Sequence, residues 1–175
     1  HIGHYTGLMY LGKEAFNSHQ TTIFAMPKMQ RFLEKNGPWN QLIYEKNIKI
    51  EPLKNKTYYH INPLIKVKPF LVPHRDEYSE TVGYQIEGPN KTVLFIPDIN
   101  KWHEWEEDIM EKITMVNYAI IDGSFFESNE IKHRDISEIP HPFINETMDL
   151  FSDMPAKEKN KIHFIHLNHT NAGLN

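Results

Sequence analysis

The stretch KTVLFIPD, residues 91–98, determines how the rest of the chain is interpreted. Its apolar middle predicts a short strand, and an acidic residue, Asp98, follows directly after that strand. The pattern recurs: His74 follows KPFLVP, Asp122 follows VNYAII, and His166 follows KIHFI. Strand ends are where α/β folds place binding groups, because the strand is rigid and the following loop is exposed. The sequence therefore predicts one shared site built from these strand ends.

Strand patterns and helix patterns alternate along the chain. We expect strands in TTIFAM (21–26), IKIEPL, TYYHI, LIKVKPFLVPH, TVGYQIEG, KTVLFIPD, VNYAIIDGSFF and KIHFIHLNHTN. We expect helices after an opening loop that ends near Thr6, over 28–35 behind Pro27, in a further turn over 39–45, and over 100–115 and 141–154. Such alternation predicts an α/β layered fold, in a single domain covering residues 1–175.

The composition narrows the classes of function. The chain has 175 residues, a net charge of -4 and no cysteine, which excludes disulfides and thiolate metal ligands. Acidic and basic residues are mixed along the chain, so no nucleic-acid partner is expected. No apolar run approaches the roughly 20 residues that cross a bilayer, so no membrane contact is expected either. The expected partner is a small-molecule substrate.

Imidazole and carboxylate side chains are the candidate metal ligands at these strand ends. The opening loop adds His1 and His4 to His74 and His166, and these four imidazoles accompany the carboxylates of Asp98 and Asp122. Imidazole nitrogen and carboxylate oxygen without thiolate suit zinc, iron or manganese. We expect one or two divalent metal ions, with zinc as the favoured element.

Four blocks of the sequence resemble the metallo-β-lactamase superfamily in their order and spacing. They are HIGHYTGL, which is similar to the tail of the His-x-His-x-Asp-His signature, PHRDEYSETVGYQI, FIPDI and FIHLNHTN. The resemblance implies an αββα sandwich of which this chain is the C-terminal part, with the N-terminal part missing. It implies a metal-dependent hydrolase that uses metal-activated water on an ester or phosphodiester-type substrate. The implied metal ligands are His1, His4, His74, Asp98 and His166.

Within the superfamily, the chain is most similar to the coenzyme-PQQ synthesis protein B group. DGSFF (122–126), HPF (141–143) and FIHLNHTN carry that similarity, and the same positions also resemble the tRNA 3′-processing endonuclease branch. The resemblance implies that Asp122 orients a ligating histidine and that His141 protonates the leaving group. The plainer alternatives are an ordinary turn at Asp122, a helix start at His141, and a helix cap at Asp98.

One residue departs from the signature. Gly3 stands where the superfamily has an aspartate that ligates a second metal, and His169 is a hypothetical substitute ligand. Two alternatives to the leading hypothesis therefore stay open. One is a phosphodiesterase or nuclease of the same fold, and the other is a degenerate, non-catalytic member that binds a metal or ligand.

Overall fold

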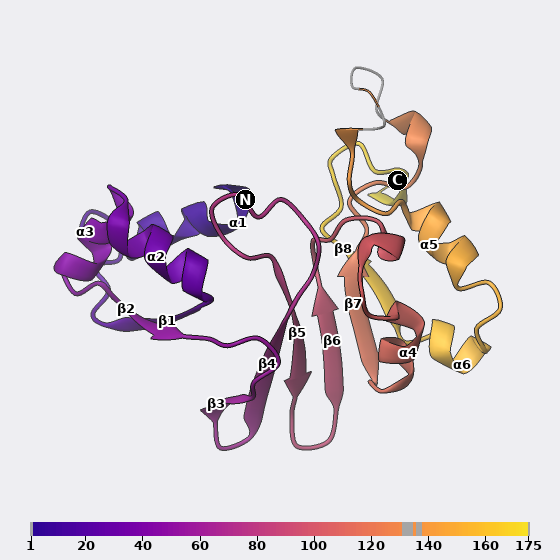
Figure 1. Ribbon diagram of the computed structural model, residues 1–175, viewed down its shortest axis with the longest axis horizontal. Helices are drawn as coiled ribbons and strands as arrows, with labels where there is room; N and C mark the ends of the chain where they lie inside the picture. The colour runs from indigo at the N-terminus through magenta and orange to yellow at the C-terminus, as the bar shows by residue number, and fades with distance from the viewer. Residues whose placement is uncertain (1, 131–134, 136–137, 175) are drawn as a thin grey trace. The chain divides into compact units, whose positions relative to one another are not determined.

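The computed structural model describes residues 2–130, 135 and 138–174 (Figure 1). The chain divides into two compact units, His1–Thr57 with Arg75–Glu80, and Tyr58–His74 with Thr81–Asn175. The single domain that the sequence suggests stays a prediction. Among the described residues, no helix is long and apolar enough to cross a membrane.

The first unit holds a small parallel sheet and short helices. Its elements in chain order are α1 (Ile2–Tyr5), η1 (Thr6–Leu11), β1 (Thr21–Ala25), α2 (Pro27–Lys35), α3 (Trp39–Tyr44) and β2 (Ile48–Pro52). Strands β1 and β2 pair in parallel. Proline at the first position of α2 has a preset φ and no N–H to satisfy, which explains why that helix begins there. The opening helix differs from expectation: helical structure begins at Ile2, continues as a 3-10 helix, and ends at an extended Gly12.

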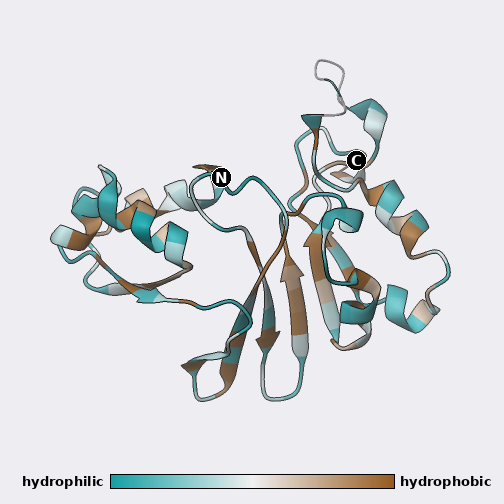
Figure 2. Ribbon diagram, in the orientation of Figure 1, coloured by the Kyte–Doolittle hydropathy of each residue, from teal (hydrophilic) through white to brown (hydrophobic). Residues whose placement is uncertain are grey.

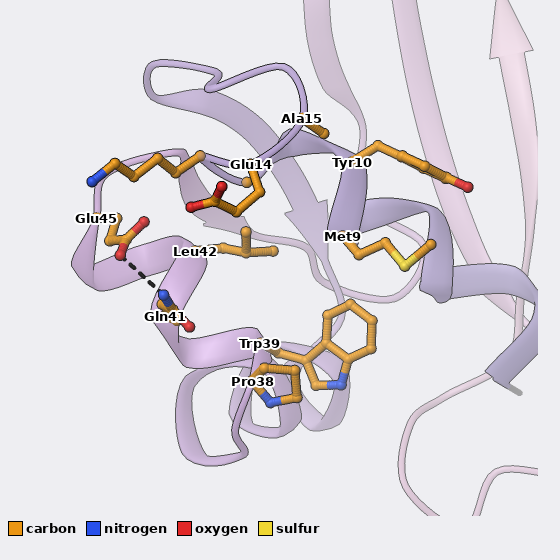
Figure 3. A pocket seen from close by; sticks show the side chains of 11 residues that line it. Met9, Tyr10, Glu14, Ala15, Pro38, Trp39, Gln41, Leu42 and Glu45 are labelled. Carbon is orange, nitrogen blue, oxygen red and sulfur yellow. Dashed lines mark hydrogen bonds between the residues drawn. The ribbon is translucent and has the colours of Figure 1, made fainter.

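A pocket of about 390 Å³ lies in this unit between η1 and α3 (Figure 3). Its wall is largely apolar, with Met9, Pro38, Trp39 and Leu42 among the lining side chains. None of the predicted site residues lines it. The pocket is therefore distinct from the site that the strand ends predict.

The second unit is built on one sheet of six strands. They are β3 (Tyr59–Asn62), β4 (Ile65–Leu71), β5 (Val82–Glu87), β6 (Thr92–Ile96), β7 (Tyr118–Asp122) and β8 (Ile162–Ile165), in that spatial order. Pairing is antiparallel from β3 to β6 and parallel from β6 to β8. Strands β4, β6, β7 and β8 consequently run in one direction, and the arrowheads of β5 and β6 point to opposite edges in Figure 1. The carboxyl ends of four strands therefore meet at one edge.

The core lies on one face of this sheet. Leu94 and Ile96 of β6 are buried, and the intervening Phe95 is only half-buried, which is the period of two that a strand imposes. The buried face packs against Ile109 and Ile113 of α4 (Ile109–Thr114). Phe151, at the end of α5 (Ile144–Leu150), completes that contact. Figure 2 shows hydrophobic colouring along β6 and β7, whereas α6 (Ala156–Lys159) is largely hydrophilic.

The predicted helix over 100–115 is wrong as one element. A 3-10 turn, η2 (Trp102–Glu104), is followed by an extended Trp105, and α4 begins only after Asp108. One long-range and one local hydrogen bond break the helix. The indole N–H of Trp105 donates to the carbonyl of Leu71 (3.0 Å), and the Asp108 carboxylate accepts the N–H of Met110 (2.7 Å) as an N-cap. The predicted stripe of apolar residues is thus divided between two elements.

The helix expected over 141–154 is shorter than its pattern suggested. Residue 143 has an extended backbone, and its N–H donates to the carboxylate of Glu146 (3.0 Å), so α5 begins at Ile144. This leaves His141 in a loop before the helix rather than in it. Short 3-10 turns η3 (Ser128–Glu130) and η5 (Ala172–Leu174) complete the described elements. The eight expected strands are confirmed, with bounds that differ by a few residues.

Candidate metal centre

The strand-end residues gather at the edge where β4, β6, β7 and β8 end. His74 follows β4, Asp98 follows β6, Asp122 is the last residue of β7, and His166 follows β8 directly. Parallel strands bring these ends together even though the residues are far apart in the sequence. The common site that the sequence predicted at the strand ends is therefore explained by the direction of the strands.

His74 and Asp98 form the most buried contact of the site. His74 Nε2 lies 3.0 Å from Asp98 Oδ1, and both side chains are 2% exposed. On its other side, His74 Nδ1 lies 3.0 Å from the amide oxygen of Asn100, whose amide nitrogen donates to Glu104 (2.8 Å). An amide oxygen only accepts, so Nδ1 carries a proton and donates it. In a neutral His74, Nε2 would then present a lone pair to a carboxylate oxygen, and a cation between them relieves that repulsion.

A proton can serve as that cation. Burial, the largest single contribution, lowers the pKa of His74. The hydrogen bond and negative charge of Asp98, with smaller contributions from Asn100 and Asp122, together outweigh burial, so the pKa is raised above 6.5. His74 and Asp98 would also hold a divalent metal, which would supply the positive charge in place of the proton.

Asp122 is buried completely and is surrounded by donors. Its Oδ2 accepts from Ile99 N (3.1 Å) and His141 Nδ1 (2.8 Å). Its Oδ1 accepts from Ser124 N (2.8 Å) and Ser124 Oγ (2.7 Å). Four donors occupy the lone pairs of this carboxylate. Asp122 is therefore held by four donors, one of them His141, and its role in orienting a ligating histidine stays a prediction.

His141 lies between both aspartates. Its Nδ1 donates to Asp122 Oδ2 at 2.8 Å and lies 3.4 Å from Asp98 Oδ1. Its ring centroid is 5.2 Å from that of His74 and 6.2 Å from that of His166. The side chain is 15% exposed, so it reaches the site and keeps some access to solvent. Sequence reasoning gave His141 a proton-transfer role only, but its position also allows metal ligation.

His166 is held by a residue that the sequence analysis missed. His166 Nδ1 lies 2.8 Å from the hydroxyl oxygen of Ser124, which itself contacts Asp122. Ser124 belongs to the DGSFF stretch, but a serine two residues after an aspartate is a common turn pattern. Only the approach of the loop after β8 to the loop after β7 reveals the contact, and no local signal in the sequence could have found it.

The two loops are locked together by buried hydrogen bonds. Gly123 N donates to Ile165 O (2.9 Å), and the side-chain amide of Asn171 donates to Gly123 O (2.7 Å). A Cβ on Gly123 would lie 2.8 Å from Cβ of Phe164, so only glycine fits at this approach. Asn171 is 1% exposed, which makes it another positioning residue that sequence reasoning missed.

The donor set suits a divalent metal. Ring nitrogens of His74 and His141 and an Asp98 oxygen all lie within 4.8 Å of one another, and Asp98 and His166 have donor atoms within the same limit. Asp98 therefore lies within reach of three imidazoles from three loops. Buried carboxylate with neutral imidazoles is the combination that zinc and similar divalent ions take in proteins.

The other residues that the sequence suggested as ligands are His1, His4 and the hypothetical substitute His169. His1 lies outside the described residues, and His4 and Gly3 belong to α1 in the first unit, so the ligand roles of His1 and His4 stay predictions. His169 is exposed, and its Nδ1 lies 3.1 Å from the side-chain oxygen of the neighbouring Asn168. Nothing in that contact points to metal ligation, and its role as a substitute ligand stays a hypothesis.

Comparison with known proteins identifies the class. Residues 1–164 match the family described as the beta-lactamase superfamily domain. The chain therefore belongs to that family, and the metallo-β-lactamase-type α/β fold expected from the sequence is confirmed. No curated protein matches the sequence.

Solved structures agree on the fold. Zinc-bound PqqB from Methylobacterium extorquens is similar with a TM-score of 0.72 at 21% identity, over 99% of this chain and 59% of that one. Unliganded yeast PDE1 gives 0.65 at 15% identity, over 98% and 56%. The metallo-β-lactamase fold protein YhfI from Bacillus subtilis gives 0.60 at 16% identity, over 97% and 60%. This chain thus spans less than two thirds of each.

Proposed function

We propose that this protein is a metal-dependent hydrolase that binds a divalent ion through Asp98, His74 and His166. Zinc is the favoured ion. His1 and His4 are the further ligands that the signature implies. One observation carries the proposal: the buried Asp98 carboxylate lies within reach of ring nitrogens from three histidines. A buried acid of this kind requires a cation, and imidazole donors around it favour a metal over a lysine or arginine.

The surrounding residues have separate tasks in the proposed reaction. When bound, a divalent metal supplies an activated water, with a pKa lowered from about 15.7 to about 7, and polarises the substrate oxygen. Asn100 holds His74 with its proton on Nδ1, so that Nε2 faces Asp98. Asp122 accepts the Nδ1 proton of His141, so Nε2 of that ring has a lone pair that can take up a proton and then give that proton to the leaving group.

The substrate class is part of the proposal. A small ester or phosphodiester of the kind that the PqqB-like resemblance implies is favoured over nucleic acid, because the net charge of -4 disfavours binding a polyanion. A phosphodiesterase or nuclease of the same fold stays as the second candidate, since the DGSFF and HPF positions also resemble the tRNA-processing branch. Gly3 supports the third candidate, a member that binds a metal without turnover, because glycine cannot replace the missing aspartate ligand.

Metal analysis and turnover separate these candidates. We expect the full-length protein to bind zinc at a stoichiometry that metal analysis measures. The variants His74→Ala and Asp98→Asn should lose the zinc, and His60→Ala should keep it. His60 is an exposed residue of β3 and serves as the matched histidine control. Hydrolysis of p-nitrophenyl acetate against bis-p-nitrophenyl phosphate then distinguishes an esterase from a phosphodiesterase. Metal binding without turnover of either supports the non-catalytic member, and absence of metal binding contradicts the proposal.

A further inference from the structure

Ser124 is a buried hydroxyl with three titratable neighbours. It is 4% exposed, and its Oγ lies 2.7 Å from Asp122 Oδ1, 2.8 Å from His166 Nδ1 and 3.3 Å from His141 Nδ1. A hydroxyl has one proton to donate and two lone pairs with which to accept. The direction of each bond can therefore be worked out from what the neighbours are able to do.

The carboxylate fixes the direction of the hydroxyl proton. Asp122 Oδ1 can only accept, so Ser124 Oγ donates to it. The Ser124 proton is then used, and the 2.8 Å contact with His166 is a hydrogen bond only if His166 Nδ1 donates to Oγ. His141 uses its own Nδ1 proton at the shorter distance to Asp122 Oδ2, 2.8 Å against 3.3 Å to Ser124.

The backbone keeps these atoms in place. His166 has φ 64, in the left-handed region that a side chain disfavours, a conformation that persists only where the surrounding structure imposes it. Asn168 N donates to Ser124 O (2.9 Å), and Asn171 Nδ2 also reaches that oxygen (3.3 Å). The loop that carries His166 is thus tied to the residue that contacts its ring.

We infer that Ser124 is a positioning residue: its hydroxyl, oriented by Asp122, holds His166 in the tautomer with the proton on Nδ1. Nε2 is then the nitrogen with the lone pair, and it is the atom that would bind the metal. The metal part of this inference rests on the proposed function, whereas the tautomer is a property of the protein before any metal binds. A serine that only filled space beside His166 would not determine which nitrogen is protonated.

The tautomer can be read directly by NMR of ring nitrogens. We would label the full-length protein with ¹⁵N-histidine, remove metal, and assign His166 by comparison with His166→Gln at a pH where the ring is neutral. The wild type should show a protonated Nδ1 and an unprotonated Nε2 at His166. Ser124→Ala should lose that preference, whereas Ser124→Thr, which keeps the hydroxyl, should retain it.

Zinc affinity gives a second readout. Loss of an outer hydrogen-bond partner of a metal ligand typically weakens metal binding by about 10–100-fold, and we expect a loss of that size in Ser124→Ala. Ser124→Thr should stay close to the wild type, and Ser152→Ala, an exposed serine after α5, should match it. Competition of the protein with a coloured zinc chelator measures each dissociation constant.

The outcomes separate this inference from the proposed function. A wild-type His166 protonated on Nε2 overturns the inference, as does Ser124→Ala with unchanged tautomer and unchanged zinc affinity. A protein that binds zinc but hydrolyses nothing overturns the proposed activity and leaves the tautomer result intact. If Ser124→Ala does not fold, the wild-type spectrum and Ser124→Thr still decide the question.

Discussion

Replacement of Asp122 by asparagine tests the hydrogen-bond arrangement at the end of β7. The carboxylate is 0% exposed and accepts from two backbone N–H groups, a hydroxyl and an imidazole. Asparagine keeps the shape but turns one oxygen into an NH₂ group. His141 can change tautomer and the Ser124 hydroxyl can rotate, so each can accept from that new donor. A backbone N–H cannot, and either Ile99 N or Ser124 N loses its acceptor.

The expected cost follows from that count. One buried N–H without an acceptor costs about 1–3 kcal/mol, and the remaining bonds lose the strengthening that a charged acceptor gives. We expect Asp122→Asn to lower the free energy of unfolding by about 2–4 kcal/mol. Asp149→Asn is the matched control, because Asp149 is an exposed aspartate of α5, and a surface substitution usually changes stability by less than about 0.5 kcal/mol.

Urea unfolding followed by tryptophan fluorescence measures the difference. The chain has three tryptophans, and Trp39 lies in the first unit whereas Trp102 and Trp105 lie in the second. A Trp39→Phe background therefore makes the fluorescence report the unit that contains Asp122. An Asp122→Asn variant as stable as Asp149→Asn would refute the hydrogen-bond arrangement described here.

Three further predictions concern the rest of the molecule. Gly123→Ala should lower the unfolding free energy by about 1–3 kcal/mol, because its Cβ would lie 2.8 Å from Cβ of Phe164; an unchanged urea midpoint would contradict the close approach. The hydrogen bond from Lys66, followed by smaller contributions, holds the pKa of Glu87 below 4.5, so its stabilisation is present above that pH and is lost as the pH falls through the depressed pKa. Glu87→Gln should therefore cost up to about 1 kcal/mol at neutral pH and nothing in strong acid, and a cost that does not depend on pH would rule out the ion pair. Asp108→Ala should cost about 1 kcal/mol in thermal unfolding through loss of the α4 cap, and Asp108→Asn should restore most of it.

The strand ends were predictable because their signal is local. A run such as TVLFIP followed by Asp98 can be read in one short window, and the edge where such residues meet follows from parallel pairing. Strand bounds came out within a few residues for the same reason. The family was recognisable from blocks that are each short and lie in the expected order.

The helices were harder because their ends depend on single contacts. The stripe from Trp102 to Ile113 has helical spacing, yet the bond from Trp105 to Leu71 O draws the chain out of a helix. That bond joins residues 34 positions apart. Likewise, the Glu146 carboxylate moved the start of α5 past His141. A tertiary contact overrides the local pattern at Trp105, and a local capping bond sets the start of α5.

The supporting residues of the site were not predictable for a related reason. Asn100, Ser124 and Asn171 look like ordinary loop residues in the sequence. Each gains its role from a partner on another loop: Asn100 from His74, Ser124 from His166, and Asn171 from the backbone at Gly123. A single sequence shows ligand types but not which loops approach one another.

The direction of the strands also makes the opposite edge of the sheet available for engineering. The turn between β5 and β6, closed by the bond from Gly88 N to Lys91 O (2.9 Å), lies at the edge away from Asp98. Strand β6 has 5 residues, so about 16 Å of strand separates that turn from the ligand end. Pro89 and Asn90 are exposed there. A fluorophore or affinity tag introduced between them would report on the folded protein without touching the groups that hold the metal.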